Sequence, residues 1–254
     1  MNGVFQIGAT GLHAQDRALN IVANNITNMN TPGFKRAEVR FAELVGAPSA
    51  DGSVPAAGDA LAMFGVSAPG TQRMFSPGEM HPTGNPLDLA IQGEGFIELA
   101  GPDGQTLLWH GGTLRINEDG FLAGPNGLPL KAMISVPEGA TNITIDASGE
   151  VKAQAPGATE ATSIGHIDLV TVRNMDGLTD VEGGLYRAAS DSDLVTAEAG
   201  NNAGTFVQGS VELSNVELTD EMVQLMIMQR AYAASAQVVQ AGDQLAAIVN
   251  GLKR

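Results

Sequence analysis

The chain has 254 residues, a formal charge of −15 and no cysteine. This length is enough for one large domain or two small ones, and no disulfide can form within it. Residues 41–210 carry all of the net negative charge, which argues against nucleic-acid binding, because Lys and Arg must neutralise phosphates.

Membrane and secretion signals are weak in this sequence. No apolar stretch is long enough to span a bilayer. Residues 1–16 lack the basic region and unbroken apolar core of a cleaved secretory signal. We therefore expect either a cytoplasmic protein or one that leaves the cytoplasm by a route without such a peptide.

Residues 4–30 are predicted to form a helix. One apolar residue recurs at every seventh position, which places one line of side chains on one face: Phe5, Leu12, Leu19 and Ile26. Glycines near its start cost about 1 kcal/mol each relative to alanine: Gly3, Gly8 and Gly11. Such a helix is marginal alone and needs a partner surface.

The stretch NNITNMNTPGFKR, residues 24–36, is predicted to end this helix. Pro32 cannot continue a helix, and Gly33 permits an unusual dihedral angle. Asn24 and Asn25 lie one turn earlier than an ordinary helix stop requires. Their amides are therefore candidates for hydrogen bonds across a packed interface between neighbouring chains, and Phe34 is expected to anchor the turn on an apolar surface.

The middle of the chain consists of two segments with different sequence patterns. Residues 37–86 are rich in Ala, Gly, Pro and Ser without a sustained period, and we interpret them as an extended linker. Residues 87–210 contain short strand patterns and form the predicted all-β domain. Hairpin turns are predicted at Pro102-Asp103-Gly104, Glu118-Asp119-Gly120, Asn126-Gly127 and Ser148-Gly149.

The C-terminal segment, residues 211–254, contains a second predicted helix from about residue 212, with Ser214 or Thr219 as its candidate N-cap and the acidic Asp220 and Glu221 in its first turn. One heptad line is made of Leu218, Leu225, Tyr232, Val239 and Ala246, and another of Ala231, Val238, Leu245 and Leu252. Two apolar lines indicate more than one neighbour. The predicted fold is α+β: the helices of residues 1–36 and 211–254 pair as a coiled coil, with the all-β domain inserted between them.

Two other classes of protein are weighed against this architecture. An enzyme would need a catalytic arrangement, but the histidines are scattered and no H-E-x-x-H, G-x-S-x-G or phosphate-loop motif occurs. Paired carboxylates of the glycosidase type stay open. A monomeric β-rich binding module would explain the middle of the chain but would leave both helices without a role. We predict no catalytic, cofactor-binding or metal-binding residue.

Three segments resemble the bacterial flagellar rod and hook proteins. The stretch 23–36 is similar to the N-terminal signature of that family through Asn24, Asn25, Asn28, Thr31, Gly33, Phe34 and Lys35. The C-terminal hallmark is matched by Ser214, Asn215, Val216, Glu221, Met222, Gln229, Arg230, Ala231 and Tyr232. Residues 70–99 resemble the start of the family's β domain.

Within the family, the stretch TGNPLDLAI, residues 83–91, is most similar to the distal rod member, with the proximal rod and hook members as alternatives. Two segments depart from the pattern. The family's aromatic-Thr-Arg-Asp/Ala-Gly strand appears here as Leu108-Trp109-His110-Gly111-Gly112, and residues 46–66 match poorly.

The resemblance implies a structural subunit that polymerises into a hollow helical tube and transmits torque. Its partners would be further copies of itself, other rod and hook proteins and the surrounding ring proteins, without nucleic acid, membrane insertion or cofactor. It would lie in the periplasm-spanning basal body after export without a cleaved signal peptide.

The resemblance also assigns roles to assembly residues. The inner coiled coil would use Phe5, Leu12, Leu19, Ile26, Leu218, Leu225, Tyr232 and Val239, and polar contacts within or between subunits would use Asn24, Asn25, Asn28, Gln229 and Arg230. Phe34 and Lys35 would fix where the chain leaves the inner layer. Packing within one chain stays open for the apolar line, and a surface salt bridge for Arg230.

Overall fold

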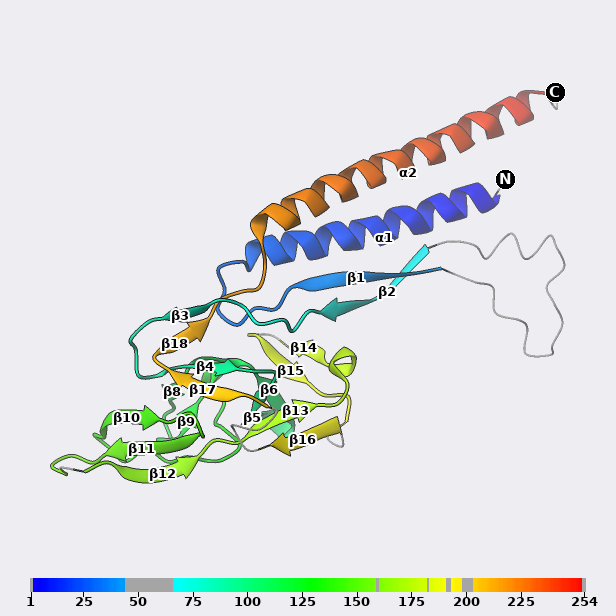
Figure 1. The fold of residues 1–254 in the computed structure, drawn as a ribbon. Coiled ribbons are helices and arrows are strands. Elements are labelled where there is room, and N and C mark those ends of the chain that lie inside the picture. The colour runs from blue at the N-terminus through cyan, green and yellow to red at the C-terminus, as the bar shows by residue number, and fades with distance from the viewer. Residues whose placement is uncertain are drawn as a thin grey trace, which may run out of the picture. The chain divides into compact units, whose positions relative to one another are not determined.

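The computed structural model describes residues 2–43, 66–158, 160–181, 183–190, 193–197 and 203–252. Most of the poorly matching segment 46–66 lies outside the described residues. The chain divides into two compact units (Figure 1). The helical unit comprises Met1–Asn28, Arg36–Met74 and Val216–Arg254, and the β-rich unit comprises Met29–Lys35 and Phe75–Asn215. The chain thus crosses between them at 28/29, 35/36, 74/75 and 215/216.

The helical unit contains two long helices and a hairpin. Helix α1 (Asn2–Thr27) and helix α2 (Leu218–Leu252) contact each other along their length, beside strands β1 (Ala37–Glu43) and β2 (Val66–Arg73) (Figure 1). Strands β1 and β2 pair antiparallel, with Ala37 opposite Arg73. The predicted N-terminal helix, C-terminal helix and intervening β domain are all confirmed.

The second helix starts later than predicted. We expected it from residue 212, but Ser210–Glu212 form strand β18 and the helix begins at Leu218. The physical reason is long-range pairing: Val211 lies opposite His81 in an antiparallel ladder with strand β3 (Met80–Pro82). Acidic residues in the first turn of α2, Asp220 and Glu221, favour a helix start there because they complement the helix dipole.

The β-rich unit is built from several small antiparallel sheets. The largest has the strand order β14-β15-β6-β5-β13-β16, and two three-stranded sheets have the orders β17-β4-β7 and β10-β11-β12. The remaining pairs in the described part of this unit are β18-β3 and β8-β9.

Further bounds, in chain order, are β4 Asp88–Gln92, β5 Phe96–Ala100, β6 Thr106–Trp109, β7 Gly111–Thr113, β8 Arg115–Ile116, β9 Leu122–Ala123, β10 Thr141–Ile145, β11 Glu150–Gln154, β12 Thr162–His166, β13 Leu169–Val172, β14 Thr179–Val181, β15 Leu185–Arg187, β16 Leu194–Ala197 and β17 Thr205–Gln208. Short 3₁₀ turns cover Pro102–Gly104, Pro125–Gly127 and Met175–Gly177.

Three predicted hairpin turns are confirmed. Pro102-Asp103-Gly104 joins β5 to β6, Glu118-Asp119-Gly120 joins β8 to β9, and Ser148-Gly149 joins β10 to β11, each in an antiparallel pair. Gly149 is required by space, because a Cβ atom there would lie 2.2 Å from the Ile167 carbonyl oxygen. The turns therefore follow from local sequence, since glycine adopts positive φ without steric cost.

The β-rich unit holds the larger hydrophobic core. Its main cluster is built mostly from Leu, Ile and Val side chains around Trp109 and Phe206. A second cluster contains Phe96 and Tyr186, which pack edge to face with Phe75 at 5.5 and 5.3 Å between ring centroids. This core accounts for the compactness of the β-rich unit, because buried apolar area is the main stabilising term.

Candidate assembly site

The buried apolar side chains of α1 are small. These core members are Ala14, Ala18 and Val22. Gly8 permits a close approach to α2, because a Cβ atom there would lie 2.5 Å from Val239 Cγ2. One polar contact joins the helices, from Gln15 Nε2 to Ser235 Oγ at 3.1 Å. The predicted residues Leu12, Leu19 and Ile26 lie half-buried beside this face, and the Phe5 side chain lies outside the described residues.

Helix α2 presents more apolar surface than α1 covers. Leu225 and Val239 of the predicted line are half-buried, whereas Leu218 and Tyr232 are each 42% exposed. A further set of side chains, which we call the outer stripe, is between 45% and 61% exposed: Val223, Ile227, Val238 and Leu245. An exposed apolar stripe of this length is typical of a surface that another protein covers.

Asn25 joins the two signature segments within one chain. Its side chain is completely buried. Asn25 Nδ2 donates to the Ala37 carbonyl oxygen at 2.9 Å and to Glu221 Oε2 at 3.1 Å, and the Ala37 N–H donates to Asn25 Oδ1 at 3.0 Å. An asparagine in the last turns of α1 thereby ties the start of β1 to the first turn of α2.

Arg36 completes this cluster. Its guanidinium donates from Nε to Glu221 and from Nη1 to Glu38. Burial by itself lowers the pKa of Arg36, but hydrogen bonds to Glu221 and Glu38 and the charges of both carboxylates raise it above the usual value. The buried Glu221 carboxylate therefore has both a cationic and an amide donor.

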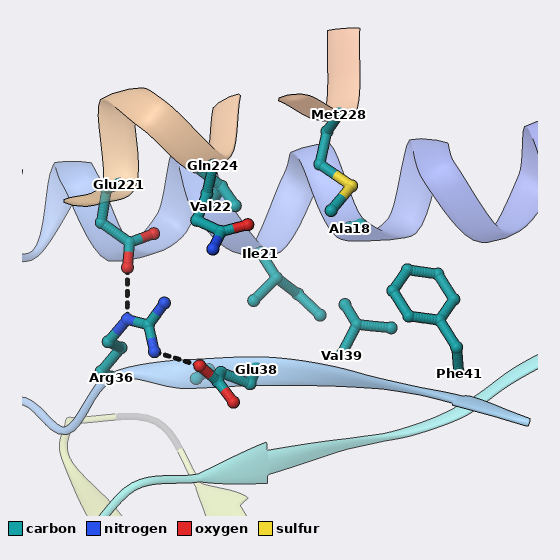
Figure 2. A pocket seen from close by; sticks show the side chains of 11 residues that line it. Ala18, Ile21, Val22, Arg36, Glu38, Val39, Phe41, Glu221, Gln224 and Met228 are labelled. Atoms are coloured by element: carbon teal, nitrogen blue, oxygen red, sulfur yellow. Dashed lines mark hydrogen bonds and ion pairs between the residues drawn. The ribbon is translucent and has the colours of Figure 1, made fainter. Parts of the chain in front are cut away.

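A cleft of about 220 Å³ lies in the helical unit between α1, β1 and α2. Figure 2 shows the ion-paired Arg36, Glu221 and Glu38 at one end and Phe41 and Met228 toward the other. The Phe41 side chain is 48% exposed. The cleft thus combines an ionic end with an apolar end.

Lys35 lies at the centre of a separate cluster inside the β-rich unit. Its Nζ donates to Glu212 Oε1 at 2.8 Å and to the Ser76 carbonyl oxygen at 3.1 Å. The Lys35 side chain is 1% exposed and the Glu212 side chain 3%. The Gly78 N–H also donates to Glu212 Oε1, at 2.6 Å. Three segments distant in sequence therefore meet at one carboxylate.

His110 is the third ionisable group of this cluster. Its Nε2 lies 3.1 Å from Glu212 Oε2. Burial by itself raises the pKa of the Glu212 carboxyl, but the hydrogen bond and charge of His110, with hydrogen bonds from Lys35 and Gly78, lower it to about 2. Glu212 is therefore ionised throughout the neutral range.

The other predicted residues lie nearer the surface. Asn24 is exposed, and its carbonyl oxygen accepts a hydrogen bond from Asn28 Nδ2 at 2.9 Å at the end of α1. Phe34 is half-buried. Gln229 and Arg230 are exposed on α2. The structure thus brings Asn25 and Lys35 into buried clusters but not these five residues.

Sequence reasoning missed the partners of these residues. The sequence patterns do not single out Glu212 or His110 as site residues, and they mark Glu221 only through the C-terminal signature and as an acidic residue at the start of the predicted helix. The sequence pattern places Glu212 at the start of the predicted helix, so its burial beside a cation follows only from the strand pairing in the structure.

Among the described residues, no group of three or more His, Asp or Glu side chains is arranged to hold a metal ion. Nor does any helix within the described ranges have the length and hydropathy to cross a membrane.

Comparison with known proteins identifies the family. Residues 5–35 match a family described as flagella basal body rod protein, residues 90–153 match the D1 domain of the flagellar hook protein FlgE/F/G, and residues 207–252 match the C-terminal region of the flagellar basal body rod FlgEFG protein. The first and third ranges contain the Asn25 and Glu221 that meet in the structure.

Relatives match over almost the whole chain. The flagellar basal-body rod protein FlgG of Agrobacterium fabrum is 32% identical over 253 residues, covering 96% of this chain and 97% of the relative. FlgG of Caulobacter vibrioides is 32% identical over 251 residues, 95% of each protein. FlgF of that bacterium is 31% identical over 244 residues, 94% of this chain and 93% of the relative.

The chain therefore belongs to the family of flagellar basal-body rod proteins, and it is a structural subunit of the bacterial flagellar basal body rod. Within that family it is most like FlgG.

Proposed function

We propose that the chain is a subunit of the distal part of the rod and polymerises into a hollow helical tube. The observation that carries this proposal is the outer stripe of α2, whose four apolar side chains stay exposed after α1 has packed against the helix. The similarity to FlgG proteins supports the distal position. The proximal rod and the hook are the alternatives, with the match to FlgF favouring the former.

The occupant of the outer stripe is the helical unit of a neighbouring subunit. That unit offers the cleft beside Phe41 and Met228, which an apolar side chain can enter. A stripe on one face and a receptor on another give a head-to-tail contact that does not close on itself, and such contacts generate helical filaments. Repetition of this contact would transmit torque through many parallel interfaces.

The helical unit is marginal before assembly. The fully buried apolar side chains of α1 in the described residues are small, Ala14, Ala18 and Val22, so their burial adds little apolar area to the stability of the unit. We propose that α1 and α2 pair as a coiled coil and become fully ordered when neighbouring copies cover them. Export as an unfolded chain, without a cleaved signal peptide, is compatible with such a helix pair.

The proposed layers follow the order of the chain. Residues 1–36 and 211–254 supply the inner layer, 37–86 the connection and 87–210 the outer domain. The acidic outer domain would face the periplasm, where the proposed partners are the ring proteins that surround the rod and the neighbouring rod and hook proteins. In this proposal the chain has a mechanical role and no catalytic one.

A charge in the outer stripe tests the proposal. We expect Ile227→Asp to abolish tube formation, observed by electron microscopy and sedimentation of the purified chain, because an aspartate would be buried without a partner. Gln240→Asp, at an exposed polar position of α2, is the matched control and should still polymerise. Tubes of normal yield from Ile227→Asp would overturn the assignment of the stripe.

Limited proteolysis distinguishes the proposal from a self-contained β-rich binding module. A rod subunit in its monomeric form should lose both terminal segments quickly and leave a resistant fragment that contains residues 87–190. A binding module whose ends belong to its fold should resist cleavage along the whole chain.

A further inference from the structure

Helix α2 extends beyond the start of α1. The two helices run antiparallel, and Gly8 of α1 lies against Val239 of α2. Counted on from that point, the first residue of α1, Asn2, is level with about Leu245. The last turns of α2, about two in number, therefore project past α1 (Figure 1). We call residues 245–252 the overhang.

The overhang carries uncovered apolar surface. Leu245 is 61% exposed and Ile248 58%. These are the two highest exposed fractions among the large apolar side chains in the described part of the chain. Residues three apart lie on the same face of a helix. Leu245 is also the last member of the outer stripe, so the overhang continues that surface beyond the helix pair.

The cleft of the helical unit lies toward the opposite end of the same helix pair. Figure 2 shows Ile21, Val39, Phe41 and Met228 around its apolar part. Phe41 is 48% exposed at its rim, and the other three side chains are half-buried. Its volume of about 220 Å³ is below the range of about 300–1,000 Å³ that is usual for small-molecule sites. The cleft is thus sized for one or two side chains.

The overhang does not reach the cleft of its own chain. Met228 and Leu245 belong to one continuous α-helix, which separates them by about 26 Å along its axis at about 1.5 Å per residue. A helix of this kind does not fold back on itself. A second copy of the chain is therefore the partner in which an overhang and a cleft can meet.

We propose that the overhang of one subunit docks in the cleft of the next, with Leu245 and Ile248 packed against Phe41 and Met228. The inference rests on the proposed function, because it takes a second copy as the partner, and it adds which two surfaces meet. An amphipathic helix in an apolar groove is a recurring mode of recognition, with anchors at the spacing i, i+3. Each subunit offers one overhang and one cleft, so the contact is head-to-tail and repeats without closing.

Paired cysteine variants test this contact, because the natural chain has no cysteine. A chain with Phe41→Cys and Leu245→Cys is brought to the concentration at which the wild type forms tubes and is treated with a short bis-maleimide. Head-to-tail docking should link each copy to two others and give a ladder of oligomers on a denaturing gel. Either variant alone should stay monomeric.

The matched control replaces Leu245→Cys by Gln240→Cys, at an exposed position on another face of α2. It should give no ladder. Equal ladders from both pairs would overturn the docking, and dimers alone would show a symmetric contact and overturn it too. Wild-type tubes without a ladder from the cysteine pair would overturn this inference only. A wild type that forms no tubes would overturn the proposed function, and this inference with it.

A charge exchange covers the case in which the cysteine pair does not assemble. Leu245→Glu and Phe41→Lys should each raise the protein concentration needed for tubes by about tenfold or more, because an apolar contact is lost and a charge is buried without a partner. The two changes together should recover most of that loss, since the new charges are opposite and adjacent. No recovery in the double variant, with Gln240→Glu assembling as the wild type does, would contradict the docking.

Discussion

Lys35 and Glu212 form a buried ion pair of 2.8 Å although they are 177 residues apart in the sequence. The next residue, Arg36, pairs with Glu221 across 185 residues. The first pair lies inside the β-rich unit and the second inside the helical unit. Lys35 and Arg36 therefore lie on either side of the crossing at 35/36, and each is held within its own unit by a glutamate. Lys35 pairs with Glu212 shortly before α2, and Arg36 pairs with Glu221 in the first turn of α2.

Removal of the Lys35 charge should destabilise the β-rich unit strongly. We expect Lys35→Met to cost about 3–5 kcal/mol in the free energy of unfolding, because a buried carboxylate loses a cationic partner. The measurement is urea unfolding followed by Trp109 fluorescence.

A surface ion pair of the same unit provides the control. Lys131 pairs with Glu98 at 2.8 Å, but its side chain is 54% exposed. Lys131→Met should therefore cost at most about 1 kcal/mol. Equal costs for the two methionine variants would show that burial does not govern the Lys35 pair.

Acid should weaken the β-rich unit through Glu212. The pKa of this carboxyl is lowered from 4.5 to about 2 in the folded chain. Its contribution to stability is thus present above about pH 4.5 and is lost as pH falls toward about 2. The contribution is on the order of 3 kcal/mol. We expect the urea midpoint to fall over this range in the wild type.

Glu212→Gln isolates this effect, because its side chain does not titrate. Its stability should change less between pH ~5 and pH ~3 than that of the wild type. Glu98→Gln, at a partly exposed ion pair, should retain the wild-type dependence. An acid dependence unaltered in Glu212→Gln would assign the effect to other carboxyl groups.

The two neighbouring asparagines should differ in their effect on the helical unit. Asn25→Ala leaves the Ala37 backbone groups and Glu221 without their amide partner, at a cost of about 2 kcal/mol or more. Cleavage of α1 and α2 in limited proteolysis should accelerate about thirtyfold, because the open population sets the rate.

Asn24→Ala is the matched control for that experiment. The Asn24 side chain is exposed, so its removal should change the cleavage rate less than about threefold. Similar rates for both variants would contradict a structural role for the Asn25 amide.

Alanine substitutions at two glycines near the start of α1 should have different effects on helix stability. Alanine gains about 1 kcal/mol over glycine in a helix interior. At Gly11 this gain should appear, since a Cβ atom would be 3.9 Å from Ser235 Oγ. At Gly8 the 2.5 Å approach to Val239 should cancel or reverse it. Circular dichroism during urea titration measures the loss of helix.

A compensating variant checks the cause of this difference. Val239→Ala removes the methyl groups that a Cβ atom at Gly8 would meet. Gly8→Ala combined with Val239→Ala should therefore recover part of the helix stability lost in Gly8→Ala alone. If the stability loss of the double variant equals the sum of the losses in Gly8→Ala and Val239→Ala, contact with Val239 is not the cause of the strain.

Local patterns predicted the elements of this protein well but their contact faces less well. Turn sequences such as Pro102-Asp103-Gly104 marked hairpins correctly, and the seven-residue apolar repeat marked both terminal helices. The most buried face of α1, however, uses Ala14, Ala18 and Val22 rather than larger neighbours. A hydrophobicity pattern ranks small residues below larger apolar ones, so it does not reveal which face of the helix is the most buried.

The sequence by itself determined the helices at both ends, the β-rich middle and the signature segments, because helix period, strand alternation and turn chemistry act over a few neighbouring residues. Only the tertiary structure decided that Lys35 meets Glu212 and His110, and that Asn25 meets Glu221. Those partners are separated by tens to hundreds of residues. The path of the backbone determines which charged side chains come together, and the cost of burying an unpaired ion requires that they form pairs. Neither factor can be read from a few neighbouring residues.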